Sequence, residues 1–315
     1  MELSLSQMPG SDALLVDALR AEREVVARRL GNAEQAAVRG LQNTLQDWRS
    51  PCRYETIGRE FSEVSESLRN TLAQDVFADV NRLLVLDLAC RLPEILPARN
   101  LPDDVIALYP AAISRLVNFL RDDAAADYYY PNEFFVKDIR FAAGLSVPCG
   151  AQIVDLRSVI GYRAALRFLA RNPHPKRLIR SARDGFVGPW FRIHTESRYL
   201  DEFNEAGWNA CYFRIASMLE REPQVLGMAG TSWFYDPQLK TVSPRLSYLR
   251  QRPLKGGAVL VRNRTTSYDI QSATAKSSNR RRLYQTGMYR PVSYTLLWPR
   301  ETLIEWARNK RERRR

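Results

Sequence analysis

The sequence has few of the side chains that metal and cofactor chemistry usually require. Two of its 315 residues are histidine and four are cysteine, and no CxxC pair occurs. A zinc or non-haem iron site normally takes two or three histidine or cysteine ligands. The glycine patterns of dinucleotide-binding folds, P-loop NTPases and α/β-hydrolases (GxGxxG, GxxxxGK[ST] and GxSxG) are also missing. We therefore expect no metal and no permanently bound cofactor.

We expect no secretory signal, and the sequence has no long apolar run. The apolar stretch over 105–120 is interrupted by Pro110 and Arg115, and it falls short of the roughly 18 residues of a membrane-spanning helix. The first residues, Met1–Ser4, do not start a basic region followed by an apolar core. The cysteines are widely spaced and favour a reducing compartment. We expect no membrane span and a cytoplasmic location.

Positive charge is in excess, and it is concentrated at one end. The formal net charge is +12, from 47 basic and 35 acidic residues. From Lys255 to Arg315 there are 15 basic and 4 acidic residues, a net charge of +11. The rest of the chain has 32 basic and 31 acidic residues and is nearly neutral. A uniformly basic nucleic-acid coat protein is therefore excluded. The charge indicates one basic surface on an otherwise ordinary globular chain.

The first part of the chain has the apolar spacing of helices. Leu14, Leu15, Ala18 and Leu19 begin one such stripe, and Pro102 with its following aspartates is typical of a helix start. We expect a helical subdomain over 1–127. Nothing in it indicates catalysis.

The pattern changes after residue 127. We expect strands at Phe134–Ala142, Ala151–Leu156, Pro189–Glu196, Val225–Tyr235, Ala258–Arg262, Tyr268–Thr274 and Val292–Trp298, and helices at Tyr162–Ala170, Trp208–Arg221, Pro244–Arg250, Asn279–Tyr284 and Thr302–Lys310. The predicted class is α+β, with the helical subdomain followed by a mixed, mainly antiparallel sheet flanked by helices over 128–315.

The strand Pro189–Glu196 carries the most information about chemistry. Side chains alternate along a strand, so Arg192, His194 and Glu196 share one face with Trp190. Three ionisable groups aligned on a strand with an apolar opposite face indicate an active-site surface. A solvated strand face is the alternative.

The segment Ser278–Tyr289, followed by Ser293–Trp298, resembles the C-terminal signature of the GNAT (N-acetyltransferase-type) superfamily. The shared features are an Asn, a short helix ending in Leu-Tyr, a Gly before an aromatic-containing turn, and a last strand. The resemblance implies a GNAT-like splayed sheet in which Tyr284 protonates the departing thiolate as a general acid. The strand Trp190–Glu196 and the helix Trp208–Arg221 resemble the central strand and the acyl-carrier-binding helix. By this analogy Glu196 or His194 is the general base.

The resemblance further implies an acyl donor with a thioester. A cluster of arginines near Tyr284 could hold the phosphates of acyl-CoA or dock an acidic acyl carrier protein, either of which would be a co-substrate: Arg262, Arg264, Arg280, Arg281 and Arg282. The stretch Arg198–Gly207 departs from the superfamily's phosphate loop, because it has one late glycine and three carboxylates. We expect an N-acyltransferase acting on a small-molecule amine acceptor.

Two other interpretations stay open. A nucleic-acid-binding protein would use the basic C-terminal segment together with Tyr268, Tyr289, Tyr294 and Trp298. A non-catalytic protein would use the N-terminal helices to bind a partner or to form a homo-oligomer.

Overall fold

The structure, a computed structural model, describes residues 11–45, 57–123, 127–161, 165–166, 182–183 and 186–312. Two units, Met1–Pro148 and Cys149–Arg315, each have their own internal contacts. The division thus lies about twenty residues beyond the point where the sequence pattern changes. Each unit is described separately below.

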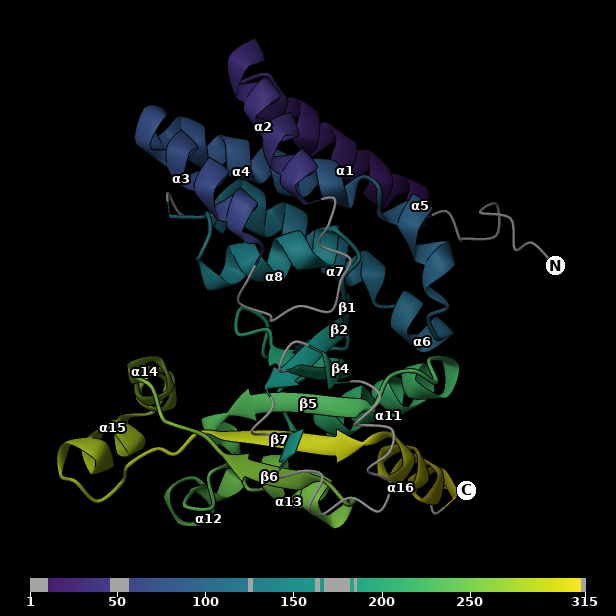
Figure 1. The fold of residues 1–315 in the computed structure, drawn as a ribbon, viewed down its shortest axis with the longest axis vertical. Helices are drawn as coiled ribbons and strands as arrows, with labels where there is room; N and C mark the ends of the chain where they lie inside the picture. Colours follow the sequence, from purple (N-terminus) through teal and green to yellow (C-terminus); the bar gives the residue numbers. More distant parts are fainter. Residues whose placement is uncertain are drawn as a thin grey trace. The chain divides into compact units, whose positions relative to one another are not determined.

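Unit 1 is helical, as the sequence indicates (Figure 1). Its central helix, α4, has buried apolar residues around most of its surface, including Phe77, Leu84 and Val85, and it packs against α1, α2 and α8. The unit's elements are α1 (Ser11–Ala27), α2 (Asn32–Thr44), α3 (Arg59–Thr71), α4 (Gln74–Ala89), α5 (Leu92–Ile95), η2 (Leu96–Arg99), α6 (Asp103–Ile106), α7 (Tyr109–Asn118), η3 (Phe119–Asp123), α8 (Glu133–Ala142) and the short strand β1 (Ser146–Pro148). In the described ranges of the chain, no helix combines the length and the apolarity needed to cross a bilayer.

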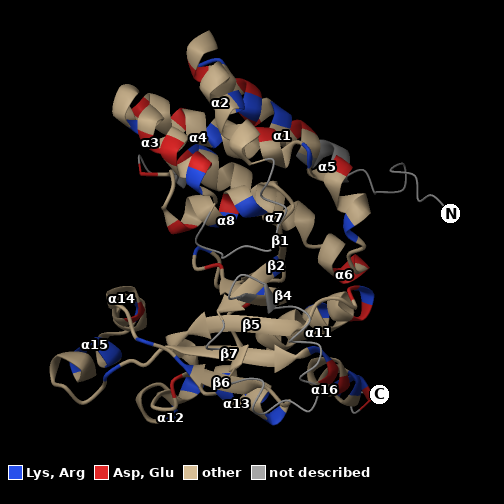
Figure 2. Cartoon of the chain, viewed as in Figure 1, with Lys and Arg blue, Asp and Glu red and all other residues tan. Residues whose placement is uncertain are grey.

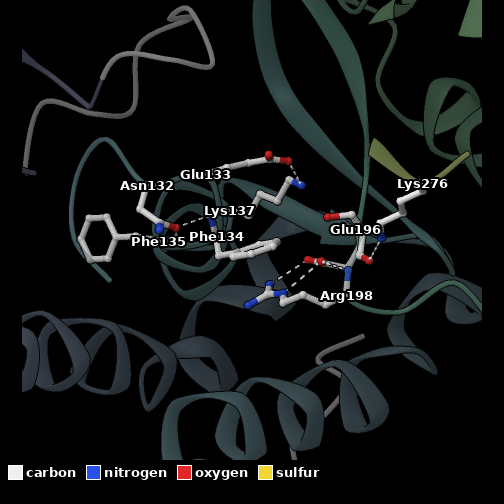
Figure 3. Close-up of polar contacts among 9 residues, drawn as sticks. Asn132, Glu133, Phe134, Phe135, Lys137, Glu196, Arg198 and Lys276 are labelled. Atoms are coloured by element: carbon white, nitrogen blue, oxygen red, sulfur yellow. Dashed lines mark hydrogen bonds and ion pairs between the residues drawn. The ribbon is translucent and has the colours of Figure 1, made fainter. Parts of the chain in front are cut away.

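The strand predicted at Phe134–Ala142 is wrong, because these residues form helix α8. The side chain of Asn132 accepts hydrogen bonds from the backbone N–H groups of Phe134 and Phe135 and so caps the helix. Glu133 and Lys137 then form an i,i+4 ion pair on its first turns (Figure 3).

Unit 2 is built on a mixed sheet, so the predicted fold class is confirmed (Figure 1). Its strands run in the order β2-β4-β5-β7-β6, with β3 also paired to β4. The pair β4–β5 is parallel, and the other pairs are antiparallel. The strands are β2 (Gln152–Gly161), β3 (Ala182–Arg183), β4 (Phe186–Thr195), β5 (Gly227–Ser232), β6 (Val259–Arg262) and β7 (Tyr294–Pro299).

Aromatic side chains fix two helices to one face of this sheet. Trp298 on β7 is fully buried, and its ring lies 5.2 Å from those of both Tyr212 on α11 and Trp306 on α16. Its indole N–H donates to the carbonyl of Gly256 at the end of α13, at 2.8 Å. The helices of the unit are α11 (Glu205–Arg221), α12 (Leu239–Val242), α13 (Tyr248–Lys255), α14 (Ser267–Ala275), α15 (Ser278–Gln285) and α16 (Arg300–Glu312), with 3-10 turns η4 (Trp233–Tyr235) and η5 (Pro244–Leu246).

The second wrong strand is Tyr268–Thr274, which forms α14. Thr266 and Asp269 make a reciprocal capping box at its start, a signal that is readable in the sequence as Thr-x-x-Asp. The remaining predicted strands and helices of unit 2 are confirmed with shifted ends, except Tyr162–Ala170. That helix lies almost wholly outside the described residues.

Candidate active site

The two faces of β4 have different surroundings. The register pairs Phe191 with Met228 on β5, and Met228 with Trp298 on β7, so Phe191 lies on the face that α11 and α16 cover. Arg192 is paired with Ala229 and lies on the opposite face. His194, two residues further along β4, shares the face of Arg192. The alternation predicted for this strand is confirmed.

His194 is bound to a buried carboxylate. Its Nε2 lies 3.1 Å from Oδ2 of Asp155 on the neighbouring strand β2. The Asp155 side chain is 1% exposed and that of His194 is 15% exposed. A buried carboxylate that accepts a ring N–H fixes the imidazole tautomer and stabilises the imidazolium formed when the ring takes up a proton. This pair has the chemistry of a general base.

Glu196, the other base candidate, is paired with an arginine. Its carboxylate accepts from the backbone N–H of Arg198 at 3.1 Å, from Nε at 3.0 Å and from a terminal guanidinium nitrogen at 2.7 Å (Figure 3). Both side chains are largely buried. Both carboxylate oxygens of Glu196 are therefore occupied by the guanidinium of Arg198. His194 is the better placed of the two residues to accept a proton.

The strands β4 and β5 separate at the level of these groups. Their register comprises two pairs, Phe191–Met228 and Arg192–Ala229, although both strands continue for three more residues. Arg192 spans the opening, because its guanidinium donates to Oγ1 of Thr231 at 3.1 Å. Beyond Arg192 and Ala229 the two strands are thus no longer paired with each other.

Hydroxyl and amide groups extend this opening into a polar row across the sheet. Oγ1 of Thr231 lies 2.9 Å from Oγ1 of Thr295 on β7, which accepts at 2.8 Å from the amide of Asn263, just after β6. With Arg192, these residues cross β4, β5, β7 and the end of β6. We call Arg192, Thr231, Thr295 and Asn263 the polar row. The sequence analysis did not identify it, or Asp155, because both depend on pairing between distant strands.

Lysine 276 connects the α14–α15 segment to the end of β4. Its ammonium donates to the carbonyl of Ser197 at 3.2 Å, one residue after Glu196 (Figure 3). The turn between α14 and α15 therefore lies beside the strand that carries His194.

The arginines predicted to bind the donor do not share one environment. Arg280 is 4% exposed: its guanidinium donates to the carbonyl of Ala273 at 2.5 Å and to Oγ of Ser243 at 2.9 Å, and it lies 4.7 Å from the centre of the Trp233 ring. This burial lowers the pKa of Arg280 from its ordinary value. The other four, Arg262, Arg264, Arg281 and Arg282, are exposed. Arg280 thus holds the α14–α15 segment together, whereas the other four lie at the surface.

Replacing Arg280 tests this structural role. Arg280→Met leaves a buried carbonyl and a buried hydroxyl without their donor, so we expect the free energy of unfolding to fall by about 2–3 kcal/mol. Urea unfolding followed by tryptophan fluorescence measures the loss. The matched variant Arg281→Met removes an exposed guanidinium from the same helix and is expected to change stability by less than about 0.5 kcal/mol. Equal losses in both variants would contradict the assignment.

Tyr284 lies on α15, and its side chain is 38% exposed. Helix α15 follows α14 in the connection between β6 and β7, and Figure 1 shows both helices beyond the strand ends instead of over a face of the sheet. Within the described residues, no hydrogen bond joins the Tyr284 hydroxyl to β4.

The start of α11 is acidic. The side chain of Asn204 accepts from the backbone N–H of Gly207 at 3.0 Å and so uses one of the free donors of the first turn. Glu202 lies 3.9 Å from Arg214, and Glu205 is paired with Arg252. The carboxylates noted in the sequence therefore surround a helix N-terminus, the place where a phosphate group would otherwise be favoured.

Two of the four aromatics that base stacking would need are buried. Tyr289 and Trp298 are both 0% exposed. The basic surface required by the nucleic-acid interpretation is present, but two of the four side chains proposed to stack on bases are buried.

No family model matches the chain, and no curated protein matches it either. Among solved structures, an acyltransferase mutant in complex with octanoyl-CoA is similar, with a TM-score of 0.49 and 12% identity over 84% of this chain and 76% of that chain. An acyltransferase with CoA and 10C-teicoplanin has a TM-score of 0.46 and 11% identity over 89% and 99%. An acyltransferase with decanoyl-CoA has a TM-score of 0.44 and 13% identity over 90% and 99%. The likeness is distant, so the function of this chain is inferred below from its own site.

Proposed function

We propose that unit 2 catalyses acyl transfer from a thioester to an amine, with His194 as the general base. One observation carries the proposal: an imidazole bound to a buried carboxylate lies at the point where a parallel strand pair opens in the middle of the sheet. This opening corresponds to the splayed sheet that the resemblance to the GNAT superfamily implies. The topology therefore supports placing unit 2 in that superfamily.

The reaction needs one proton acceptor beside the attacking nitrogen. The amine nitrogen attacks the thioester carbonyl carbon, a C–N bond forms and the C–S bond breaks. His194 takes the proton lost by the nitrogen, and Asp155 stabilises the resulting imidazolium. The leaving thiolate takes up a proton and departs as a thiol. The guanidinium of Arg192, held by Thr231, lies on the same strand face and is placed to attract an electron-rich group of the substrate.

Release of free thiol tests the proposal directly. Octanoyl-CoA is the first donor to use, offered with a panel of primary amines that includes amino acids, polyamines and amino sugars. We expect thiol release that depends on an amine, and a mass increase of that amine by one octanoyl group. The test is run with octanoyl-CoA and with an octanoylated carrier protein as donor. If no amine raises thiol release from either donor above the rate measured without an amine, the proposed activity is wrong.

The acid role of Tyr284 stays a prediction, and the same assay tests it. Tyr284→Phe removes only the hydroxyl from an exposed side chain, so the fold should be unaffected. If this hydroxyl protonates the thiolate, kcat falls by about 10²-fold or more. The effect should shrink with a donor whose thiol is more acidic, because a stable thiolate needs no acid. A kcat within twofold of the unchanged protein would remove Tyr284 from the mechanism and leave the role of His194 intact.

A further inference from the structure

The connection between β6 and β7 carries a dense positive charge. Residues 262–290, which we call the basic hairpin, contain seven basic residues and one acidic residue, Asp269. The carboxylate of Asp269 caps α14 through the backbone and side chain of Thr266. Arg280 is buried, so six cations remain exposed: Arg262, Arg264, Lys276, Arg281, Arg282 and Arg290. Figure 2 shows these blue segments along α15 and the stretches that join it to the sheet.

The same hairpin also exposes large apolar side chains. Met288 is 72% exposed, Tyr268 is 59% and Tyr284 is 38%. In the described part of the chain, seven large apolar side chains are exposed, and these three fall within a stretch of 21 residues. Exposed apolar groups surrounded by charges of one sign are typical of a surface that binds another protein. The sign of the charge selects an acidic partner.

The start of α11 disfavours a free nucleotide donor. A diphosphate binds best to the uncapped N-terminus of a helix or to a cluster of cations. At the start of α11, Asn204 caps the helix, and the nearby cations Arg214 and Arg252 are already paired with Glu202 and Glu205. The six exposed cations of the basic hairpin lie within 29 residues of sequence, and the hairpin is joined to the end of β4 through Lys276 and Ser197.

We propose that the basic hairpin docks an acidic acyl carrier protein, which delivers the acyl thioester to the opening between β4 and β5. The inference rests on the proposed function, because it names the donor of that same reaction. The docked protein would place its negative helices against Arg281 and Arg282, and its apolar contacts against Met288. Its thioester arm would enter beside Lys276 and reach His194. Transfer then follows the bond changes given above, with the carrier's thiol as leaving group.

Binding of a defined carrier protein tests the docking separately from catalysis. The probe is a bacterial fatty-acid acyl carrier protein carrying an octanoyl thioester and a fluorescent label, titrated against the full chain. In Arg281→Glu/Arg282→Glu we expect the dissociation constant to rise at least about tenfold, and binding to weaken steeply with added salt. The matched control is Arg308→Glu/Arg311→Glu on α16. It changes the net charge by the same amount at the opposite end of the sheet in Figure 1, and it should change binding by less than twofold.

The outcomes separate the docking proposal from the proposed function. Carrier binding that depends on Arg281 and Arg282, without transfer to any amine, supports the docking surface and overturns the acyltransferase. Transfer from octanoyl-CoA with no binding of the carrier overturns the docking surface and keeps the acyltransferase. Equal weakening by both double variants also overturns it, because net charge alone would then explain binding. A single-stranded 20-mer RNA that displaces the carrier and binds more tightly would assign the basic hairpin to nucleic acid instead.

Discussion

Substitution of His194 by glutamine is expected to lower kcat for acyl transfer by about 10²–10⁴-fold, the usual contribution of a positioned general base. Glutamine keeps a polar side chain of similar reach beside Asp155 but cannot accept a proton at neutral pH. The His194 side chain is 15% exposed, so the change should leave the fold intact. Thiol release from octanoyl-CoA measures the loss, and the far-UV circular dichroism spectrum checks the fold.

The pH dependence of kcat/KM identifies the base more sharply than the rate alone. If His194 accepts the proton, activity rises with pH as the imidazole loses its proton, and this limb disappears in His194→Gln. Asp155→Asn should retain a hydrogen bond but remove the charge that stabilises the imidazolium, so the pKa of the imidazole should fall, the limb should move to lower pH, and the maximal rate should fall because the base is weaker. Asp155 is thus tested as a positioning residue.

Glu196→Gln is the control that compares the two candidates for the base. Glu196 is held by three hydrogen bonds from Arg198, and its loss should mainly reduce stability, because it leaves a largely buried guanidinium without its carboxylate. We expect the acid limb of the profile to persist in this variant. If the limb vanishes in Glu196→Gln and persists in His194→Gln, the roles are reversed.

The alternation of β4 could be predicted from sequence because it is a local property. One strand of eight residues is enough to place Arg192, His194 and Glu196 on one face. The partners of these residues could not be predicted in the same way. Asp155 is 39 residues from His194, and the register between β2 and β4 shifts twice, after Asp155 and after Ser158. The polar row joins residues that are 32, 39 and 64 positions apart.

The two mistaken strands have a common cause. Phe134–Ala142 and Tyr268–Thr274 are rich in aromatic or β-branched residues, which favour strands as single residues. Both segments begin with a helix cap, Asn132 in one and Thr266 with Asp269 in the other. A cap satisfies backbone N–H groups that a strand would need to pair elsewhere, so it outweighs the composition of a short segment. The second error matters for function, because α14 is part of the basic hairpin.

Gly227 at the start of β5 is expected to be highly sensitive to substitution, because it combines a left-handed backbone with a close backbone contact. Its φ is +149°, a region that other residues rarely adopt, and a Cβ atom there would lie 2.2 Å from the backbone oxygen of Trp298. That oxygen belongs to the neighbouring strand β7, which cannot move aside without breaking the β5–β7 register at Gly227–Pro299. We expect Gly227→Ala to lower the free energy of unfolding by about 3 kcal/mol or more, since backbone strain and overpacking add.

Substitutions at two further glycines separate the effect of backbone strain from the effect of overpacking. Gly287 has a φ of +74° and no atom within 4 Å of an added Cβ, so Gly287→Ala should show the strain alone, about 1 kcal/mol. Gly40, inside α2, has neither problem, and Gly40→Ala should raise stability by about 0.5–1 kcal/mol. Urea unfolding of the three variants should therefore give a large loss, a small loss and a gain. If Gly227→Ala loses no more stability than Gly287→Ala, strand β7 can shift to make room for the added methyl group.

If β7 cannot shift, the substitution also displaces Thr231, which lies on β5 and contacts Thr295. Acyl transfer should then fall together with stability.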